Sequence, residues 1–541
     1  MMKRLFFQAT GSVVSAAALV ACFSVLSRLV GFFRDRILAG MFGAGDTLDV
    51  YFTAFRIPDL MFNLIIVGAL SASFIPIFTQ HFKTEKDKAW RYTSNVLNIF
   101  VLLFLAVAIL GTAFSPIIAK LVAPGFSALK QDFVAKESSI LFLGQIFFAI
   151  SMVFGSVLQS TKRFLLYSVA PIVYNLGIIF GALFFVPVMG PLGLAWGTVL
   201  GAATHALVQT AGAYGLGYRY RWSFSLDRDM ITTLRQMVPR MLGLAVNQVN
   251  FLVMTSFASL LAAGSVTVLQ FSYNLNFFVV GVIGVSYAIA AFPTFCEVAT
   301  DKDRLRGSIS STVRQVLFFV IPATVLFVLL RAQLVRLVFG AGDFDWPATI
   351  ATADALAFFA ISFFAQCLVF VLVRAFFALK DTWTPFCVGL LGAGVNLGLG
   401  YWLLPHAGVA GLTLAFSVAA MLQFAMLWVL LRGQLGSLDE SRILRSALIL
   451  SIAGLLAAFV TQVMKTEFVN FIADIWGWEL NTFHAVLGQL LVTSAAGLLV
   501  YFGAAMLLRS PEVQEFSSGL RSKFLRSAKP TEPVTQENSA T

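Results

Sequence analysis

The chain has 541 residues, of which 59% are hydrophobic and 12% are charged, and its mean hydropathy is +0.87. Soluble globular domains carry about 25% charged residues, so this composition excludes a soluble domain. Apolar runs of roughly 20 residues, the length needed to cross hydrocarbon, recur along the chain, which predicts an all-α integral membrane protein with many transmembrane helices.

We expect about 14 transmembrane helices. In chain order the predicted spans cover residues 10–40, 48–80, 93–120, 138–160, 164–188, 192–216, 238–262, 266–298, 313–338, 350–378, 384–404, 408–431, 443–464 and 484–508. The first run follows a basic start and resembles a signal peptide. Because its apolar stretch is longer than is usual for a signal peptide, we expect it to be retained as the first helix.

The distribution of basic residues predicts the topology. When the N-terminus is placed in the cytoplasm, most of the 37 Lys and Arg residues fall on the cytoplasmic side. The connections "HFKTEKDKAWR" and "TDKDRLRGSISSTVR" are basic, whereas "PVMGPLG" on the outer side has no charge. The positive-inside rule therefore favours two cytoplasmic termini. Because this topology accounts for most of the net charge of +11, we predict no nucleic-acid partner.

An internal repeat suggests two lobes. Pro76 in "ASFIPIF" corresponds to Pro293 in "AAFPTFC", and Asn175 falls near Asn396 at almost the same spacing. With six spans in each copy, both halves enter the membrane from the same side and are related by a pseudo-twofold axis along its normal, as in transporters that rock one lobe against the other. The predicted organisation is an N-terminal lobe (1–216), a cytoplasmic linker (217–237), a C-terminal lobe (238–432), two further C-terminal spans (433–508) and a polar cytoplasmic tail (509–541).

Charged residues occur inside the first two spans, where each costs about 2.5–3.5 kcal/mol at the bilayer centre. Arg28 and Asp35 share one helical face, Arg34 lies beside them, and Arg56 and Asn63 follow one stripe of the second span. A guanidinium group binds phosphate oxygens in bidentate geometry. Several of them facing one cavity would therefore suit a di-anionic headgroup.

A structural role is the alternative for these arginines. They can pair with Asp35, with Asp59 or with carbonyl groups at helix ends, or extend to the membrane interface. We assign this role to Arg36. For Arg28, Arg34 and Arg56 we favour the cavity.

The same stretches resemble a known family. "SRLVGFFRD", "DVYFTAFRIPDL" and "GALSASFIPIF" are similar to the start of the lipid II flippase family MurJ, also called MviN, of the multidrug/oligosaccharidyl-lipid/polysaccharide exporter superfamily. Similar stretches, such as "APIVYNLGIIFGA" and "RAFFALKDTWTP", extend the resemblance over about residues 10–430. It implies alternating-access transport of lipid II, undecaprenyl-pyrophosphate-MurNAc-pentapeptide-GlcNAc, from the inner to the outer leaflet of the bacterial cytoplasmic (inner) membrane for peptidoglycan synthesis.

The resemblance also implies a set of binding residues. It places the cavity arginines of the family at Arg28, Arg34 and Arg56, and its Pro-x-x-x-Asn motif at Pro171 and Asn175. Where some relatives carry a further arginine in the eighth span, this chain has Asn274. Where some have a sodium-binding carboxylate in the eleventh, it has Asn396, which argues against sodium coupling and leaves voltage or another ion open as the energy source. The predicted substrate-binding residues are Arg28, Arg34, Asp35, Arg56, Asn63, Pro171, Asn175 and Asn274.

Other classes of site have little support in the sequence. Cys22, Cys296, Cys367 and Cys387 show no CxxC spacing, and no HExxH, DxD, GxSxG or Walker pattern occurs. We therefore expect no metal, no cofactor and no catalytic residues.

Two alternative functions stay open: an exporter of drugs or of another polyprenyl-linked saccharide, and, less favoured, a membrane-embedded polyprenyl-phosphate enzyme. The expected partners are lipid II and membrane lipids, and we expect a functional monomer. The last two spans line a groove for the lipid tail or pack at the periphery.

Overall fold

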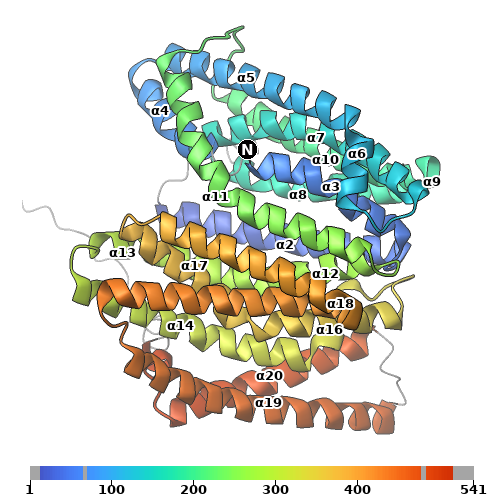
Figure 1. The fold of residues 1–541 in the computed structure, drawn as a ribbon, viewed down its shortest axis with the longest axis vertical. Helices are drawn as coiled ribbons and strands as arrows, with labels where there is room; N and C mark the ends of the chain where they lie inside the picture. Colours follow the sequence, from blue (N-terminus) through green and yellow to red (C-terminus); the bar gives the residue numbers. More distant parts are fainter. Residues whose placement is uncertain (1–12, 65–69, 477–482, 516–541) are drawn as a thin grey trace, which may run out of the picture. The chain divides into compact units, whose positions relative to one another are not determined.

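The structure, a computed structural model, describes residues 13–64, 70–476 and 483–515, and the regular elements in these ranges are all helices (Figure 1). Within these ranges, eight helical stretches are long and apolar enough to cross a membrane, and α16 with α17 adds a ninth if the two form one bent span. The chain is an all-α integral membrane protein, as its composition predicts, while the number of fourteen spans stays a prediction.

The helices of the described residues follow one another with short connections. They are α2 (Val13–Phe42), α3 (Asp46–Phe62), α4 (Leu70–Thr84), α5 (Lys86–Ala113), α6 (Ser115–Val122), α7 (Ala128–Ser160), α8 (Phe164–Phe180), η2 (Gly181–Phe185), α9 (Val186–Met189), α10 (Leu192–Gly215), α11 (Arg228–Ser259), α12 (Ser265–Val280), η3 (Gly281–Val285), α13 (Ser286–Glu297), α14 (Lys302–Leu329), α15 (Arg331–Phe339), α16 (Trp346–Ile361), α17 (Phe363–Ala378), α18 (Trp383–Leu435), α19 (Glu440–Trp476) and α20 (Phe483–Leu507). The start of the first predicted span and residues 516–541 of the predicted polar tail lie outside the described residues.

Side-chain caps place the starts of some helices before the predicted apolar runs. α7 begins ten residues before the predicted span at 138–160, where the Ser127 hydroxyl accepts a hydrogen bond from the Lys130 N–H. α11 also begins ten residues before its predicted span, where the Asp227 carboxylate accepts one from the Met230 N–H at 2.9 Å. A cap gives a partner to an N–H group that the first helical turn leaves unpaired, so these helices continue through polar residues.

Breaks within predicted spans depend on local backbone conformation. α18 contains two predicted spans, 384–404 and 408–431, and Gly408 between them has a φ of +54°. Glycine adopts this left-handed conformation without a Cβ clash, which allows the chain to turn there. Within the predicted span 48–80 the structure describes α3 and α4, and residues 65–69 between them lie outside the described residues.

Contacts between helices divide the chain into two compact units. The described residues of the first unit come from Met1–Phe277, Arg331–Ser362 and Trp383–Gln423, and those of the second come from Phe278–Leu330, Phe363–Thr382 and Phe424–Thr541. The lobes predicted at 1–216 and 238–432 and their pseudo-twofold relation stay a prediction.

In the first unit, α10 packs against α7 and, through glycines, very closely against α8 (Figure 1). A Cβ atom added to Gly177 of α8 would lie 2.3 Å from the Cα of Gly201, and one added to Gly181 would lie 2.3 Å from the Cα of Gly197. The four-residue spacing puts the glycines of each helix on one face, the pattern that lets membrane helices approach closely. This contact fixes the relative positions of α8 and α10.

A buried carboxylate joins α3 to the start of α12 in the same unit. Asp49 is 1% exposed and accepts hydrogen bonds from the N–H groups of Gly264 at 2.7 Å and Thr267 at 2.8 Å, and from the Thr267 hydroxyl at 2.7 Å. Asp49 therefore caps the first turn of a helix more than two hundred residues later in the chain. This capping holds α12 beside α3.

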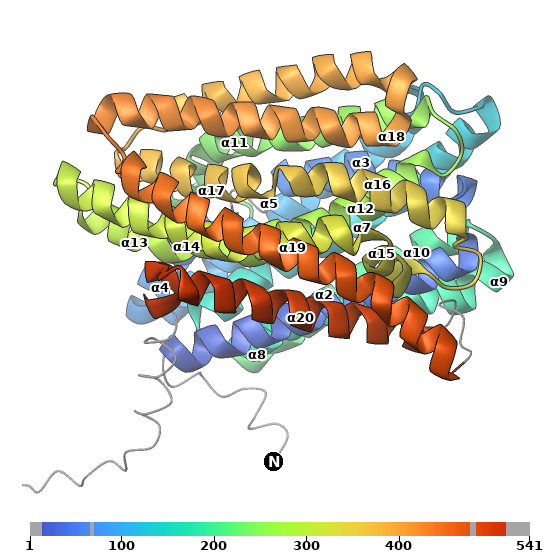
Figure 2. The same cartoon turned by 90° about the horizontal axis from the view of Figure 1, so that it is seen from below.

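In the second unit, α19 packs along α20 and against α14 (Figure 2). Glu512, which follows α20, is buried and accepts hydrogen bonds from Arg314 at 2.6 Å, Ser446 at 2.7 Å and Ser510 at 2.6 Å. Burial raises the pKa of Glu512, but the hydrogen bonds from Ser510, Ser446 and Arg314 outweigh it and hold the pKa below its ordinary value. This carboxylate ties the end of the described chain to α14 and α19.

Candidate functional site

A cavity of about 420 Å³ lies within the first unit. Its walls come from α2, α3, α7, α8 and α10, with one residue from α12. Much of the surface is aromatic, from Phe52, Phe55, Phe62 and Phe148, and Pro171 also lines it. The polar and charged lining residues are Arg34, Tyr51, Arg56, Asp59, Gln145, Tyr174, His205 and Gln270. The cavity thus combines aromatic surface with two guanidinium groups.

Arg34 belongs to a hydrogen-bond network that joins α2 to α8 and α12. Its Nε and Nη2 atoms donate to Asp35 Oδ1 at 2.9 and 2.6 Å, and its Nη1 atom donates to Asn175 Oδ1 at 2.9 Å. Asn274 donates to the other Asp35 oxygen at 2.9 Å. Four of the predicted binding residues, Arg34, Asp35, Asn175 and Asn274, therefore meet at one side of the cavity.

A hydrogen bond within its own helix orients Asn175 toward Arg34. The Asn175 side-chain amide donates to the carbonyl oxygen of Pro171, one turn earlier on α8, at 3.0 Å. The other end of the Asn175 amide then presents its oxygen to Arg34. The Pro-x-x-x-Asn spacing thus orients an amide acceptor toward the cavity.

Arg56 lies on another wall of the cavity, on α3. It donates a hydrogen bond to Gln270 of α12, and its guanidinium carbon lies 4.3 Å from the centre of the Phe251 ring. Its buried Nε atom has no hydrogen-bond partner among the described residues. Asp59, one turn further along α3, also lines the cavity. Arg56 therefore retains an unused donor at the cavity.

The remaining predicted residues do not line the cavity. Arg28 is half-buried on α2, nearly two turns before Arg34, and Asn63 donates to the Asp59 carbonyl oxygen at 2.9 Å. Without Arg28, the two arginines of the site face two carboxyl groups, those of Asp35 and Asp59. Arg34 and Arg56 are thus the predicted arginines that line the cavity, and the binding role of Arg28 stays a prediction.

Arg36 has the structural role expected for it. It points away from this network and donates to the carbonyl oxygens of Leu337 at 2.5 Å and Gly340 at 3.2 Å, at the end of α15. Carbonyl groups at a helix C-terminus carry partial negative charge and attract a cation. Arg36 therefore fastens the end of α2 to α15.

Several polar lining residues were missed by the sequence analysis. Gln145 Oε1 is buried and has no hydrogen-bond partner among the described residues. His205 Nδ1 lies 2.5 Å from the Ser151 hydroxyl, and its ring is 5.5 Å from that of Phe148. The sequence could have identified them, because each is an isolated polar residue inside an apolar run. In membrane helices such residues often face the interior of the protein and serve its function. Gln270 carried a similar signal, one turn before Asn274.

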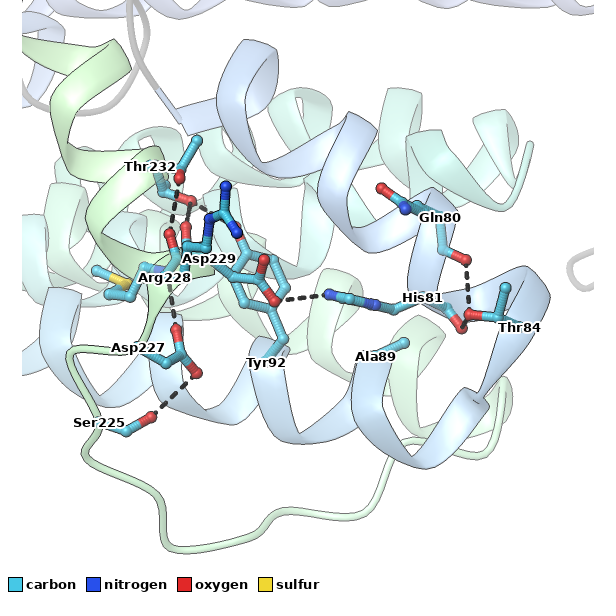
Figure 3. Close-up of polar contacts among 12 residues, drawn as sticks. Gln80, His81, Thr84, Ala89, Tyr92, Ser225, Asp227, Arg228, Asp229 and Thr232 are labelled. Carbon is cyan, nitrogen blue, oxygen red and sulfur yellow. Dashed lines mark hydrogen bonds and ion pairs between the residues drawn. The ribbon is translucent and has the colours of Figure 1, made fainter.

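Another polar cluster of the first unit joins the end of α4 to the start of α11. His81 Nε2 lies 2.7 Å from Asp229 Oδ2, and Figure 3 shows these side chains pointing toward each other beside Tyr92. The Tyr92 hydroxyl in turn lies 2.7 Å from that of Thr233. This cluster is separate from the cavity and fastens α11 to α4 and α5.

The fold is shared with solved membrane transporters. It is similar to an inward-facing structure of a multidrug resistance MATE family transporter of the MOP superfamily, with a TM-score of 0.62 and 15% identity over 76% of this chain and 96% of the other. It is also similar to a structure of lipid II flippase MurJ in an inward closed conformation, with a TM-score of 0.75 and 22% identity over 91% of this chain and 98% of the other. A helical membrane protein with a cavity inside its first unit is thus the class that the fold defines.

Sequence comparison is more specific. The family model for lipid II flippase MurJ matches residues 38–475. A protein of Buchnera aphidicola subsp. Schizaphis graminum, named probable lipid II flippase MurJ, is 28% identical over 418 residues, which are 76% of this chain and 81% of that protein. The chain belongs to the lipid II flippase MurJ family. It is accordingly a transporter and not an enzyme.

Proposed function

We propose that the chain moves lipid II from the inner to the outer leaflet of the bacterial cytoplasmic membrane, with the pyrophosphate bound between Arg34 and Arg56. The observation that supports this most directly is that both guanidinium groups line one cavity in which Arg56 Nε has no partner among the described residues. Phosphate oxygens are the acceptors that guanidinium donors bind in bidentate geometry. The names of the related proteins supply the same substrate.

The other cavity residues fit the uncharged part of such a substrate. Tyr174 and Phe148 place their rings 5.0 Å apart, and Gln145 and His205 add hydrogen-bonding groups beside them. Aromatic faces with amide and imidazole groups suit the apolar and hydroxyl-bearing sides of a sugar. The pyrophosphate would then occupy the arginine side of the cavity and the saccharide the side formed by α7, α8 and α10.

The wider transport scheme belongs to this proposal. The headgroup enters the cavity from the cytoplasmic leaflet while the prenyl chain stays in lipid, beside the spans predicted at 433–508. Two lobes, 1–216 and 238–432, then change their relative orientation and open the cavity to the other side. We propose that one copy of the chain suffices and that both termini are cytoplasmic.

The test is restoration of wall synthesis in bacterial cells depleted of their own lipid II flippase. The wild-type chain should restore growth and outer-leaflet lipid II, whereas Arg34→Ala and Arg56→Ala at matched membrane levels should not. Arg91→Ala removes an exposed arginine of α5 and serves as the control, expected to match the wild type. Arg34→Lys and Arg56→Lys should restore only part of the activity, because a lysine keeps the charge but loses the bidentate geometry.

The same assay examines the alternatives. Arg28→Ala and Asn63→Ala test two predicted binding residues that neither line the cavity nor bond to Arg34 or Asp35. A wild-type chain that is present in the membrane but does not restore wall synthesis would favour an exporter with another cargo. Full activity of both Arg34→Ala and Arg56→Ala would refute the proposed phosphate site.

A further inference from the structure

A buried carboxyl group without a partner lies in α7, one of the helices that form the cavity. The Glu137 side chain is fully buried, and neither of its carboxyl oxygens has a hydrogen-bond partner among the residues that the structure describes. A buried, unpaired carboxylate costs several kcal/mol even after relaxation of its surroundings, so the carboxyl group is held here as the neutral acid.

The surroundings of Glu137 are apolar on every helix that packs there. Val134 and Leu141 share its face of α7, because they lie three and four residues away. They belong to a buried cluster with Val50, Ala54, Ala119 and Ala195 from α3, α6 and α10. The adjacent Ser138 donates a hydrogen bond to the Ala54 carbonyl oxygen at 3.0 Å, which brings this turn of α7 close to α3.

Two hydroxyl groups lie between this cluster and the cavity. Tyr51, one turn before Ala54 on α3, lines the cavity. Its hydroxyl oxygen lies 2.8 Å from that of Thr198, which is one turn after Ala195 on α10. The two hydroxyl groups thus lie one helical turn from residues of the apolar cluster, and such groups can pass a proton between a buried acid and water in a cavity.

Other titratable groups near α7 have different surroundings. On α7 itself, Asp132 and Lys136 are exposed and pair with each other at 2.6 Å. Lys120 of α6 is exposed, and Asp49 of α3 is bonded to α12. Lys130 of α7 pairs with Asp46 of α3 at 2.5 Å. Among the groups on other helices, Tyr174 of α8, His205 of α10 and Tyr92 of α5 contact later turns of α7.

We propose that Glu137 is a proton-binding site of the transport cycle and that Tyr51 and Thr198 connect it to the cavity. In the exchange, the O–H bond of the acid breaks, the proton passes to water and a carboxylate remains; the reverse step restores the acid. A di-anion in the cavity repels the carboxylate and so favours the protonated form. By linkage, protonation of Glu137 strengthens anion binding by the same factor. The role in transport rests on the proposed function, whereas the existence of the proton site does not.

Infrared spectroscopy of the purified chain in lipid nanodiscs tests the proton site without any substrate. The wild type at neutral pH should show the C=O absorption of a protonated carboxylic acid that Glu137→Gln lacks and Asp132→Asn keeps. Because Gln is neutral and of similar size, Glu137→Gln should also keep the thermal midpoint of the wild type. A carboxylate absorption in the difference between wild type and Glu137→Gln would overturn the proposal.

Transport of lipid II in proteoliposomes tests the coupling. One pH unit across the membrane corresponds to about 1.4 kcal/mol per proton, so it should change the wild-type rate by up to about tenfold. Asp132→Asn should respond like the wild type, and Glu137→Gln should give the same rate with and without the gradient. A wild-type transport rate that is the same with and without the pH gradient would refute the coupling and leave the proposed function intact. If the wild type does not transport lipid II, the proposed function fails, and infrared spectroscopy alone decides on the proton site.

Discussion

Replacing Asp35 by Asn should tighten the binding of a pyrophosphate lipid while making the protein less stable. The Asp35 carboxylate accepts two hydrogen bonds from Arg34, at 2.9 and 2.6 Å, and one from Asn274 at 2.9 Å. Its side chain is only 3% exposed, so water screens it weakly. Asp35 therefore competes with any anion for Arg34, and it also orders this part of the site.

The two effects differ in origin and can be estimated separately. A phosphate on the free side of the Arg34 guanidinium would lie roughly 7 Å from the Asp35 carboxylate, where two unit charges repel by about 2 kcal/mol at an effective dielectric constant near 20. Removing this repulsion corresponds to about 30-fold tighter binding. The two hydrogen bonds from Arg34 lose their anionic acceptor, and the Asn274 N–H group loses its carboxylate partner, which together lower the free energy of unfolding by roughly 2–4 kcal/mol.

Calorimetric titration of nanodisc-embedded protein with undecaprenyl pyrophosphate measures the affinity, and thermal unfolding measures the stability. Asn274→Ala is the matched control, because it removes one hydrogen bond to Asp35 and keeps the carboxylate. It should lower the stability without tightening binding. Unchanged or weaker binding by folded Asp35→Asn would refute the idea that Asp35 competes with the phosphate for Arg34.

Three further predictions concern stability and the linker. Folding lowers the pKa of Glu512 from its ordinary value of 4.5, so its contribution to stability is complete only above that pH and is lost as the pH falls through the lower folded-state pKa. Glu512→Gln should flatten this acid-side decline in thermal unfolding. Gly181→Ala should lower the free energy of unfolding by about 1–3 kcal/mol, since its Cβ would meet Gly197, whereas Gly398→Ala, with nothing within 4 Å, should not. Asn95→Ala removes hydrogen bonds to the N–H and C=O groups of Ser225, at 2.8 and 2.7 Å, and should speed amide hydrogen exchange at Ser225 by about tenfold.

The sequence by itself determined the class of the protein. Long apolar runs with few charges leave a membrane-spanning helix as the stable local structure, because its backbone groups are all paired within the helix. A charged side chain facing lipid costs free energy, so the sequence also predicted that Arg34 and Arg56 face the protein interior. Both line the cavity. The first residues of the helices were less predictable. Ser127 and Asp227 cap α7 and α11 several residues before the apolar runs begin, and a hydropathy pattern contains no information on capping.

Only the tertiary structure decided which of these residues act together. Arg34 meets Asn175 and Asp35 meets Asn274 across 141 and 239 positions of sequence, and helix packing brings those amides to α2. Arg28 carries the same local signal as Arg34, yet it does not line the cavity. Helical periodicity predicts which side of its own helix a residue occupies. It does not predict which other helix packs against that side, because this depends on close contacts such as that of Gly181 with Gly197. The burial of Glu137 likewise depends on apolar side chains from three other helices, which α7 by itself does not reveal.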